Sequence, residues 1–275
     1  MKLDLANRWA LVTGASSGIG EEFARQLAAR GMHLVLTARR EERLFALSRQ
    51  LQQQHGCQVV LLPLDLARPE DVKQLVERVR QLPQPLHLLV NNAGIGNVAT
   101  LQETNPGRML EIVDLNIRAV TDLTYALLPD MVRRNEGGVI NVASVAAFQP
   151  IAYMSVYAAS KAFVLHFSEG LWAELQETNV RMLALCPGTT RTEFFEQAGV
   201  ENWLTRRSAH NVTTVVKAAL ESFERKRAIC VPGWNNWFAS LLHRVFRRAV
   251  VVSQTKKIFG AHLEPKPERE NSTHA

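Results

Sequence analysis

Three side chains stand at spacings that could support proton transfer. Tyr157 and Lys161 are four residues apart in a segment predicted to be helical, 155–178, so their side chains share one face. A phenol has a pKa of about 10, and a nearby ammonium favours the phenolate, which would bring the pKa of Tyr157 towards neutrality and make it a general acid or base. Ser144 lies upstream, at the carboxyl end of a predicted strand. Without other motifs, such a tyrosine and lysine usually form only a surface pair on a helix.

A glycine-rich turn near the N-terminus predicts a phosphate site. The first predicted strand runs into Thr13-Gly14-Ala15-Ser16-Ser17-Gly18-Ile19-Gly20, and a helix follows. Glycines permit a tight turn and a close approach of the backbone to a phosphate, while the helix start adds free N–H groups and a positive dipole end. The spacing is GxxxGxG rather than the more common GxGxxG. Its place between a strand and a helix is where open α/β sheets bind ligands.

The apolar pattern predicts a doubly wound parallel sheet. Short runs rich in Val, Ile and Leu mostly lack polar alternation, as strands buried on both faces do. The predicted strands are Trp9–Thr13, His33–Ala38, Gln58–Leu64, Leu86–Val90, Gly138–Ala143, Arg181–Leu185 and Ala228–Val231. Amphipathic segments lie between them, at 19–30, 41–54, 69–81, 106–133, 155–178 and 211–226. We therefore expect an α/β, Rossmann-like fold: a seven-stranded parallel sheet with helices on both faces.

Taken together, the motifs resemble the short-chain dehydrogenase/reductase family in its compact single-domain form. After TGxxxGIG come Asn91-Asn92-Ala93-Gly94, Asn116, Ser144, Tyr157-Ala158-Ala159-Ser160-Lys161 and Pro187-Gly188, in that order. The resemblance covers residues 5–233, and six motifs in the right order and spacing are specific. It implies an oxidoreductase that interconverts a ketone or aldehyde and an alcohol by hydride transfer with a nicotinamide cofactor.

The resemblance also implies a catalytic set, Asn116, Ser144, Tyr157 and Lys161. Ser144 would hold the substrate carbonyl oxygen by a hydrogen bond, and Tyr157 would give that oxygen a proton as hydride arrives. Lys161 would also bind the nicotinamide ribose hydroxyls. Asn116 would interrupt its helix and hold a water that relays protons to Lys161. The other interpretation of Asn116 is a helix-interior asparagine that is solvated or bonded to local backbone.

The residues after the second strand predict NADP(H) as the cofactor. A site for NAD usually has an acid about 20 residues after the glycines, bonded to the ribose 2′-OH. Here Ala38 stands where the family has its NAD-selecting Asp, and Arg39 and Arg40 follow. The Arg39 guanidinium can form bidentate hydrogen bonds with a 2′-phosphate and stack on the adenine. The alternative is that both arginines only cap the next helix, with Glu41 and Glu42 neutralising them.

Further cofactor contacts follow from the resemblance. Asp65 would bond the adenine amino group with Leu66 beside it, the Asn91–Gly94 segment would line the adenosine ribose and nicotinamide side, and Thr192 would contact the carboxamide. The expected cofactor-binding residues are Gly14, Ser16, Ser17, Gly18, Ile19, Gly20, Arg39, Arg40, Asp65, Leu66, Asn92, Ala93, Gly94, Tyr157, Lys161, Pro187, Gly188 and Thr192. No metal site is expected, because the three cysteines are far apart and form no CxxC pair.

The substrate is less defined by the sequence. Apolar residues flank the catalytic tyrosine and follow the Pro187-Gly188 turn: Phe148, Ile151, Met154, Phe194, Phe195 and Trp203. Pocket linings are largely apolar with few polar anchors, so this set predicts a hydrophobic carbonyl or alcohol substrate. Ile151 and Phe194 fit ordinary core packing equally well. The preference for NADP(H) favours reduction as the cellular direction.

The C-terminal segment supplies the net positive charge of the chain. The chain has a net charge of +6, and residues 225–263 contain eight Lys and Arg and no Asp or Glu. Apolar residues recur every four positions from Trp237 and from Phe238, which predicts a basic amphipathic helix of about four turns over 235–250. Two placements are open: packing on the body or a partner subunit, or lying on an anionic membrane surface.

The expected organisation is a catalytic domain over 1–233, a basic amphipathic extension over 234–263 and a disordered tail over 264–275. We expect a cytoplasmic protein, since no signal peptide or disulfide framework is evident, and no nucleic-acid partner, because the body is nearly neutral. The resemblance implies a homodimer or homotetramer through the helices near 106–133 and 155–178. The alternative function is a nucleotide-binding regulatory or scaffold protein with little turnover; an epimerase or dehydratase would need a larger C-terminal domain.

Overall fold

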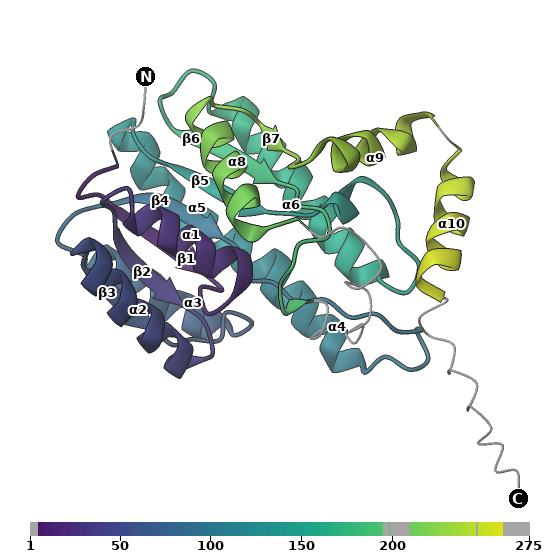
Figure 1. The fold of residues 1–275 in the computed structure, drawn as a ribbon, viewed down its shortest axis with the longest axis horizontal. Helices are drawn as coiled ribbons and strands as arrows, with labels where there is room; N and C mark the ends of the chain where they lie inside the picture. The colour runs from purple at the N-terminus through teal and green to yellow at the C-terminus, as the bar shows by residue number, and fades with distance from the viewer. Residues whose placement is uncertain (1–4, 195–197, 199–209, 246, 261–275) are drawn as a thin grey trace, which may run out of the picture.

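The computed structural model describes residues 5–194, 198, 210–245 and 247–260, and it confirms the predicted fold. Seven parallel strands lie in the order β3-β2-β1-β4-β5-β6-β7, with helices on both faces (Figure 1). The strands are β1 (Trp9–Thr13), β2 (His33–Thr37), β3 (Val59–Leu62), β4 (Leu86–Asn91), β5 (Gly138–Val142), β6 (Arg181–Leu185) and β7 (Ile229–Cys230). The strand order reverses between β1 and β4, and a ligand crevice is expected at that point in this class of sheet.

Each face of the sheet has its own apolar core. One core holds the inner sides of α1 (Gly18–Ala28), α2 (Glu41–His55) and α8 (Val212–Glu224) against the sheet. The other holds α3 (Pro69–Arg80), α4 (Pro106–Val113), α5 (Ala119–Arg134) and α6 (Ser155–Glu174). Strands β1 and β4 are buried along their whole length, which is why they lack a regular alternation of apolar and polar residues.

Helix boundaries follow local signals. α3 begins with Pro69 and has Glu70 and Asp71 in its first turn, where carboxylates interact favourably with the helix dipole. The Asn105 side chain caps α4 by accepting a hydrogen bond from the Gly107 amide at 2.8 Å. The predicted helix 106–133 is interrupted: a π-helical turn, η1 (Asp114–Arg118), separates α4 from α5 and contains Asn116. Such turns are frequent at functional sites.

The C-terminal segment differs from the expected single helix over 235–250. It forms two helices, α9 (Trp234–Val245) and α10 (Arg248–Gly260), which project together from the β7 side of the sheet (Figure 1). The change of direction brings α10 back to the body, where the Ala152 amide donates a hydrogen bond to Thr255 Oγ1 at 3.1 Å and Gly260 packs on Tyr153. A straight continuation of α9 would make neither contact. The tail expected to be disordered, 264–275, lies outside the described residues.

Candidate active site

A cavity of about 670 Å³ opens where the strands end, and most of the expected site residues line it. Those lining it are Gly14, Ser16, Ser17, Gly18, Ile19, Arg39, Arg40, Asp65, Leu66, Asn92, Ala93, Gly94, Ser144, Tyr157, Lys161, Pro187, Gly188 and Thr192. Asn116 and Gly20 do not line it. Segments that are far apart in the chain therefore meet at the position where the strand order reverses.

The glycine-rich turn presents a helix N-terminus to this cavity. Gly18 has a φ of +58°, a conformation that favours glycine, and it begins α1. The Ser17 side chain makes no capping hydrogen bond, so it does not occupy the first free N–H groups of α1. Free amides together with the positive dipole end suit a phosphate group.

Gly20, which does not line the cavity, has a packing role in the structure. A Cβ at this position would lie 2.3 Å from the Gly14 carbonyl oxygen and 2.4 Å from Asn92 Nδ2. Gly20 is buried, and its missing side chain lets the first turn of α1 pack tightly against the loops after β1 and β4. The third glycine of the motif thus stabilises the glycine-rich turn by packing against Gly14 and Asn92.

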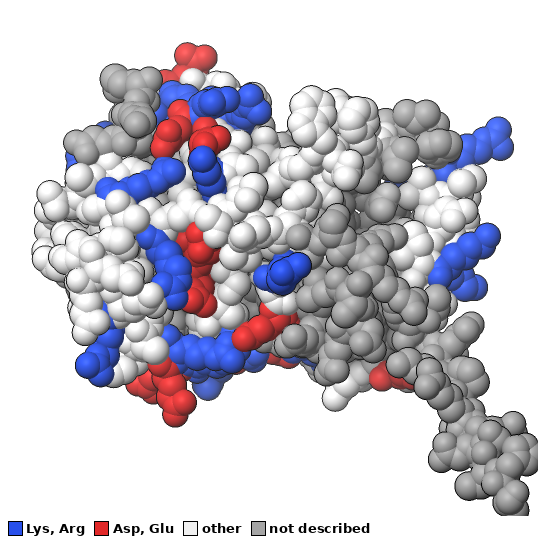
Figure 2. Space-filling model, in the orientation of Figure 1, with Lys and Arg blue, Asp and Glu red and all other residues white. Residues whose placement is uncertain are grey.

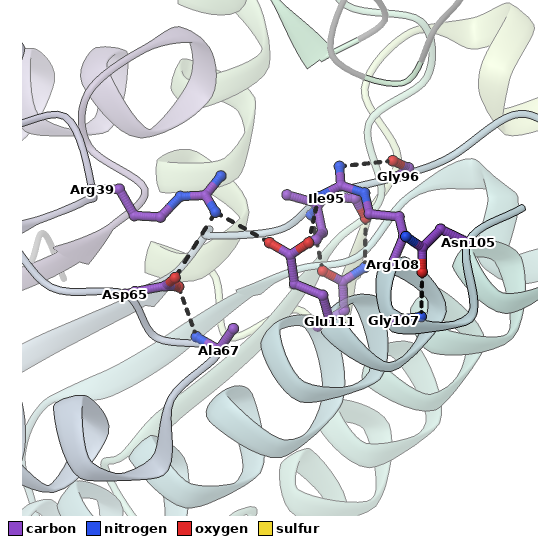
Figure 3. A network of polar contacts seen from close by, with 10 residues as sticks. Arg39, Asp65, Ala67, Ile95, Gly96, Asn105, Gly107, Arg108 and Glu111 are labelled. Atoms are coloured by element: carbon purple, nitrogen blue, oxygen red, sulfur yellow. Dashed lines mark hydrogen bonds and ion pairs between the residues drawn. The ribbon is translucent and has the colours of Figure 1, made fainter.

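Arg39 belongs to an ion-pair network at the cavity wall (Figure 3). Its Nη1 lies 3.1 Å from Glu111 Oε1 and 3.9 Å from Asp65 Oδ2. Glu111 also accepts a hydrogen bond from Arg108 Nη1 at 2.7 Å, and Arg108 Nη2 donates to the Gly96 carbonyl. Arg39 is about half exposed, so its guanidinium remains accessible to an anion. No sequence pattern singles out Glu111 or Arg108, which lie on α4, far from Arg39 in the chain.

Arg40 points towards the phosphate turn. It donates hydrogen bonds to Ser17 Oγ at 2.7 Å and Ser16 Oγ at 3.2 Å, and its Nη1 lies 2.6 Å from Glu193 Oε2. Hydrogen bonds from Arg40 and Arg43 hold the pKa of Glu193 below its usual value. Neither Arg39 nor Arg40 caps α2 with its side chain. The capping alternative is therefore wrong for these side chains.

Tyr157 and Lys161 lie on α6 at the other end of the cavity, next to Ser144. Ser144 follows β5, and its hydroxyl bonds to Tyr157, the contact that lowers the pKa of the phenol. Lys161 Nζ donates a hydrogen bond to the Val142 carbonyl at 2.8 Å and lies 5.9 Å from the centre of the Tyr157 ring. Both side chains are buried, at 8% and 5% exposure respectively.

Our expectation that Lys161 brings the pKa of Tyr157 towards neutrality is wrong for this structure. Burial raises the pKa of Tyr157 to about 12 and outweighs the hydrogen bond from Ser144. Burial also lowers the pKa of Lys161 to about 8. The ammonium is bonded to the Val142 carbonyl and lies over the ring, so burial is the larger influence on the phenol. The site therefore holds a protonated phenol near neutral pH.

Asn116 lies behind the cavity wall, fully buried in η1. Its Nδ2 donates hydrogen bonds to the Ile95 carbonyl and to Ser160 Oγ, both at 3.0 Å, and its Oδ1 accepts one from the Ile95 amide. The solvated alternative for Asn116 is therefore wrong. A Cβ on Gly94 would lie 3.2 Å from Asn116 Oδ1 and 3.2 Å from Lys161 Nζ. Both side chains therefore pack against this glycine.

Two further asparagines connect the loops and strands beneath the site. Asn91 Nδ2 donates to Asn141 Oδ1 at 2.9 Å and to Thr124 Oγ1 at 3.1 Å, which links β4, β5 and α5. Asn92 Nδ2 donates to the Thr13 carbonyl at 2.9 Å and so joins the loop after β4 to the end of β1. These bonds fix the loops on both sides of the point where the strand order reverses.

α9 contributes a residue that we did not predict from the sequence. The Asn236 carboxamide lies across Gly188: a Cβ there would be 2.4 Å from both its Nδ2 and its Oδ1. Asn236 lines the cavity, and its Nδ2 also donates a hydrogen bond to the Pro232 carbonyl. A larger residue at 188 would therefore force the Asn236 carboxamide to move.

The end of the cavity beyond Tyr157 is largely apolar. Of the residues expected there, Ile151, Met154 and Phe194 line it, and the Phe194 ring lies 5.2 Å from the Tyr157 ring. Phe148 packs in the core instead, and Phe195 and Trp203 lie outside the described residues. Residues that the sequence did not single out complete the wall: Arg108, Gln149, Thr255, Ile258 and Phe259. Thr255, Ile258 and Phe259 come from α10. Their helical spacing was the signal in the sequence that could have identified them.

Two kinds of site are not found within the described residues. They contain no group of His, Cys, Asp and Glu side chains that could hold a metal ion. None of the described helices is long and apolar enough to cross a membrane.

Comparison with known proteins gives a consistent result. The family model for short chain dehydrogenase matches residues 8–203. An uncharacterised oxidoreductase of Staphylococcus saprophyticus is 33% identical over 74% of this chain and 86% of its own. A short-chain dehydrogenase from Sphingobium yanoikuyae, solved in complex with NADPH, is 32% identical with a TM-score of 0.78, covering 97% of this chain and 100% of the other. A bulky-bulky ketone specific alcohol dehydrogenase from Comamonas testosteroni is 29% identical with a TM-score of 0.74, covering 98% and 96%.

Proposed function

The chain belongs to the short-chain dehydrogenase/reductase family, and on that premise we propose that it is an NADP(H)-dependent oxidoreductase that interconverts an apolar ketone or aldehyde and its alcohol. The observation that carries the proposal is one continuous cavity, with Arg39 at one end and Ser144, Tyr157 and Lys161 at the other. The Sphingobium relative, which this chain matches over 97% of its length, was solved with NADPH.

The residues present fit a nicotinamide dinucleotide phosphate. The uncapped start of α1 suits the pyrophosphate, and Arg39 is a half-exposed cation placed for a 2′-phosphate. Asp65 and Leu66 would flank the adenine, and Asn92, Ala93 and Gly94 would line the middle of the site. Pro187, Gly188 and Thr192 would lie on the nicotinamide side. When bound, the reduced cofactor supplies the hydride.

The chain's own residues would handle the substrate oxygen and its proton. Ser144 donates a hydrogen bond that fixes the carbonyl oxygen, and Tyr157 transfers its phenolic proton to that oxygen as the alcohol forms. The raised pKa of Tyr157 keeps the phenol protonated at neutral pH, which suits reduction. Lys161 holds positive charge beside the phenol and would bind the ribose hydroxyls, while Asn116 fixes the Ile95 backbone and Ser160 next to it.

The apolar end of the cavity favours a hydrophobic substrate. Ile151, Met154 and Phe194 face the space beyond Tyr157, and the Comamonas relative is described as specific for bulky-bulky ketones. Gln149 and Thr255 are neutral polar side chains that line this end, so they would orient a distant hydroxyl or carbonyl group of the substrate.

Turnover with purified protein tests this proposal. We expect NADPH oxidation with bulky apolar ketones, little with NADH, and a loss of about 10²–10⁴-fold in kcat for Tyr157→Phe, the usual contribution of a general acid. Ser144→Ala should lower kcat as well, without weakening NADPH binding. Tight NADPH binding without turnover on any ketone, aldehyde or alcohol would instead favour the nucleotide-binding scaffold alternative.

Organisation and assembly are part of the proposal. We assign 1–233 as the catalytic domain and regard α9 and α10 as an extension that completes its cavity. A homodimer or homotetramer through α4, α5 and α6 is supported by an aromatic cluster on α5 and α6, in which the Tyr125 and Phe163 rings lie 6.0 and 5.6 Å from the Phe167 ring. Tyr125 is 64% exposed. Three free, buried cysteines fit a reducing cytoplasm.

A further inference from the structure

The described side chains at the start of α9 differ from those of a helix that packs its apolar stripe on a soluble body. Asn236 lines the cavity and Ser240 is 6% exposed, so these two polar residues face inward, while Asn235 is exposed. Trp234, Trp237 and Phe238 face outward, at 78%, 45% and 58% exposure. An ordinary surface helix buries its apolar stripe and leaves its polar side in water. The outward stripe therefore needs a partner outside this chain's own core.

The three exposed rings form one patch. The Trp237 and Phe238 centroids are 5.1 Å apart, and Trp234 lies 6.3 and 6.4 Å from them. Single exposed apolar side chains are normal on soluble proteins, but a contiguous aromatic patch marks a site of interaction with a protein or a membrane. We call these three residues the α9 aromatic patch.

The segment that follows the α9 aromatic patch is rich in positive charge. No Asp or Glu occurs in residues 225–263. Arg247, Arg248, Lys256 and Lys257 on and before α10 are exposed, and none has a carboxylate partner among the described residues. Figure 2 shows Lys and Arg side chains projecting at the α10 end of the molecule. Elsewhere on the described surface, arginines are commonly paired, as Arg25 is with Glu21 and Arg30 with Glu224.

Exposed aromatic rings next to unpaired cations favour one kind of partner for this surface. A second copy of the chain would bring the same unpaired cations against each other, which is unfavourable. An anionic bilayer offers a negative surface for the cations and an interfacial region in which Trp and Phe side chains insert. We propose that the α9 aromatic patch and the α10 cations dock the protein on an anionic lipid surface, with α9 lying in the interface plane.

Docking would place the bilayer beside the substrate end of the cavity. The inner sides of the same two helices line it, through Asn236 on α9 and Thr255, Ile258 and Phe259 on α10. An apolar substrate dissolved in lipid would then reach Tyr157 from the docked side. This consequence rests on the proposed function, whereas docking itself does not.

Vesicle flotation with the full chain tests the docking. Vesicles of phosphatidylcholine alone are compared with vesicles in which a third of the lipid is phosphatidylglycerol. Each cation near an anionic surface strengthens binding by about fivefold, so we expect Lys256→Gln/Lys257→Gln to weaken binding to anionic vesicles by about 25-fold. Trp234→Ala/Trp237→Ala/Phe238→Ala should abolish it.

Phe45→Ala/Leu101→Ala is the matched control, because it removes two large exposed apolar side chains away from α9, at 55% and 90% exposure, and should leave binding unchanged. Turnover of a water-soluble ketone, measured without vesicles, should be the same in the α9 triple variant and the wild type. That measurement separates failure of docking from failure of the proposed function.

Three results would overturn the inference. The wild type could bind neutral and anionic vesicles equally weakly, or the triple variant could bind as tightly as the wild type. Alternatively, the wild type could ignore vesicles while the triple variant shows a smaller mass in light scattering, which would make the α9 aromatic patch an interface between copies of this chain.

Discussion

Substitution of Arg39 provides a sharp test of the cofactor assignment, because it should affect the binding of NADPH and of NADH to different extents. We propose Arg39 as the cation that binds the 2′-phosphate, and its Nη1 lies 3.1 Å from Glu111 Oε1. NADPH carries that phosphate and NADH does not. We therefore expect Arg39→Ala to weaken NADPH binding and to leave NADH binding within about twofold.

The size of the effect follows from charges and distances. A 2′-phosphate carries nearly two negative charges, and each interacts with a guanidinium at about 4 Å in water by about 1 kcal/mol. Removing Arg39 also removes its half-exposed pair with Glu111, which contributes about 0.5 kcal/mol and competes with the phosphate. The net loss of about 1.5 kcal/mol corresponds to about a tenfold rise in the Kd for NADPH.

Glu111→Gln should act in the opposite direction. If the phosphate binds on the side of the guanidinium away from Glu111, the two anions would be roughly 7 Å apart and repel each other by about 1 kcal/mol in water. The variant loses this repulsion and the competing ion pair, while Gln can still accept the hydrogen bond from Arg108 (Figure 3). We expect the Kd for NADPH to fall by about tenfold and the Kd for NADH to change little.

Calorimetric titration of each variant with both cofactors measures these constants, at low and high salt. Arg133→Ala is the control, since Arg133 is a more exposed arginine paired with Asp130 that does not line the cavity. The reasoning is refuted if Arg39→Ala leaves the ratio of the two Kd values unchanged, or if Glu111→Gln weakens NADPH binding. In the second case Glu111 would orient Arg39 for the phosphate rather than compete with it.

Three further outcomes are expected. The kcat/KM for alcohol oxidation should rise with pH from roughly pH 7 to 10, while the kcat/KM for ketone reduction stays flat. Burial raises the pKa of Tyr157 to about 12, and this residue must lose its proton for oxidation and keep it for reduction. Equal pH profiles in the two directions would contradict this expectation. Burial lowers the pKa of Lys161 from 10.5 to about 8, so the unfolded chain binds more protons between these values and stability rises with pH there. Urea unfolding of the protein without cofactor should show a gain approaching about 3 kcal/mol across that window, which Lys161→Met should lack. Gly188→Ala should lower the Tm by about 5 °C and weaken NADPH binding, because its Cβ would lie 2.4 Å from the Asn236 amide. Adding Asn236→Ala should restore the Tm and the affinity for NADPH. If it restores neither, the two residues are not coupled.

The cofactor half of the site could be predicted because its signals are local in the chain. The glycine-rich turn lies between one strand and one helix, and Arg39 follows the next strand directly, so spacing alone gives the position of each. What spacing does not reveal is burial. The sequence placed an ammonium near Tyr157 and gave the wrong direction for its pKa, because the extent of burial around α6 depends on every element packed over it. The packing of Gly20 was missed for a similar reason, since its neighbour Asn92 comes from a distant loop.

The substrate half could not be predicted in the same way. Thr255, Ile258 and Phe259 share one face of α10, but nothing in their spacing says where α10 lies. Its position depends on the break between α9 and α10 and on the bond from the Ala152 amide to Thr255. Glu111 was missed because its partner Arg39 is distant in the chain and the pairing exists only once α4 packs beside the cavity.

The orientation of α9 shows why a partner outside the chain is needed. Amphipathic spacing identifies an apolar face, but it does not say whether that face points inward. Here the Asn236 amide lies on Gly188 and bonds to the Pro232 carbonyl, which turns Trp234 and Phe238 outward. Burying a large apolar side chain contributes about 1.5–3 kcal/mol, so leaving these rings in water forgoes much of that stabilisation. A helix held in this orientation by its contact with the active site can recover it only through a surface that covers the rings, and an anionic bilayer is the surface that also satisfies the cations of α10.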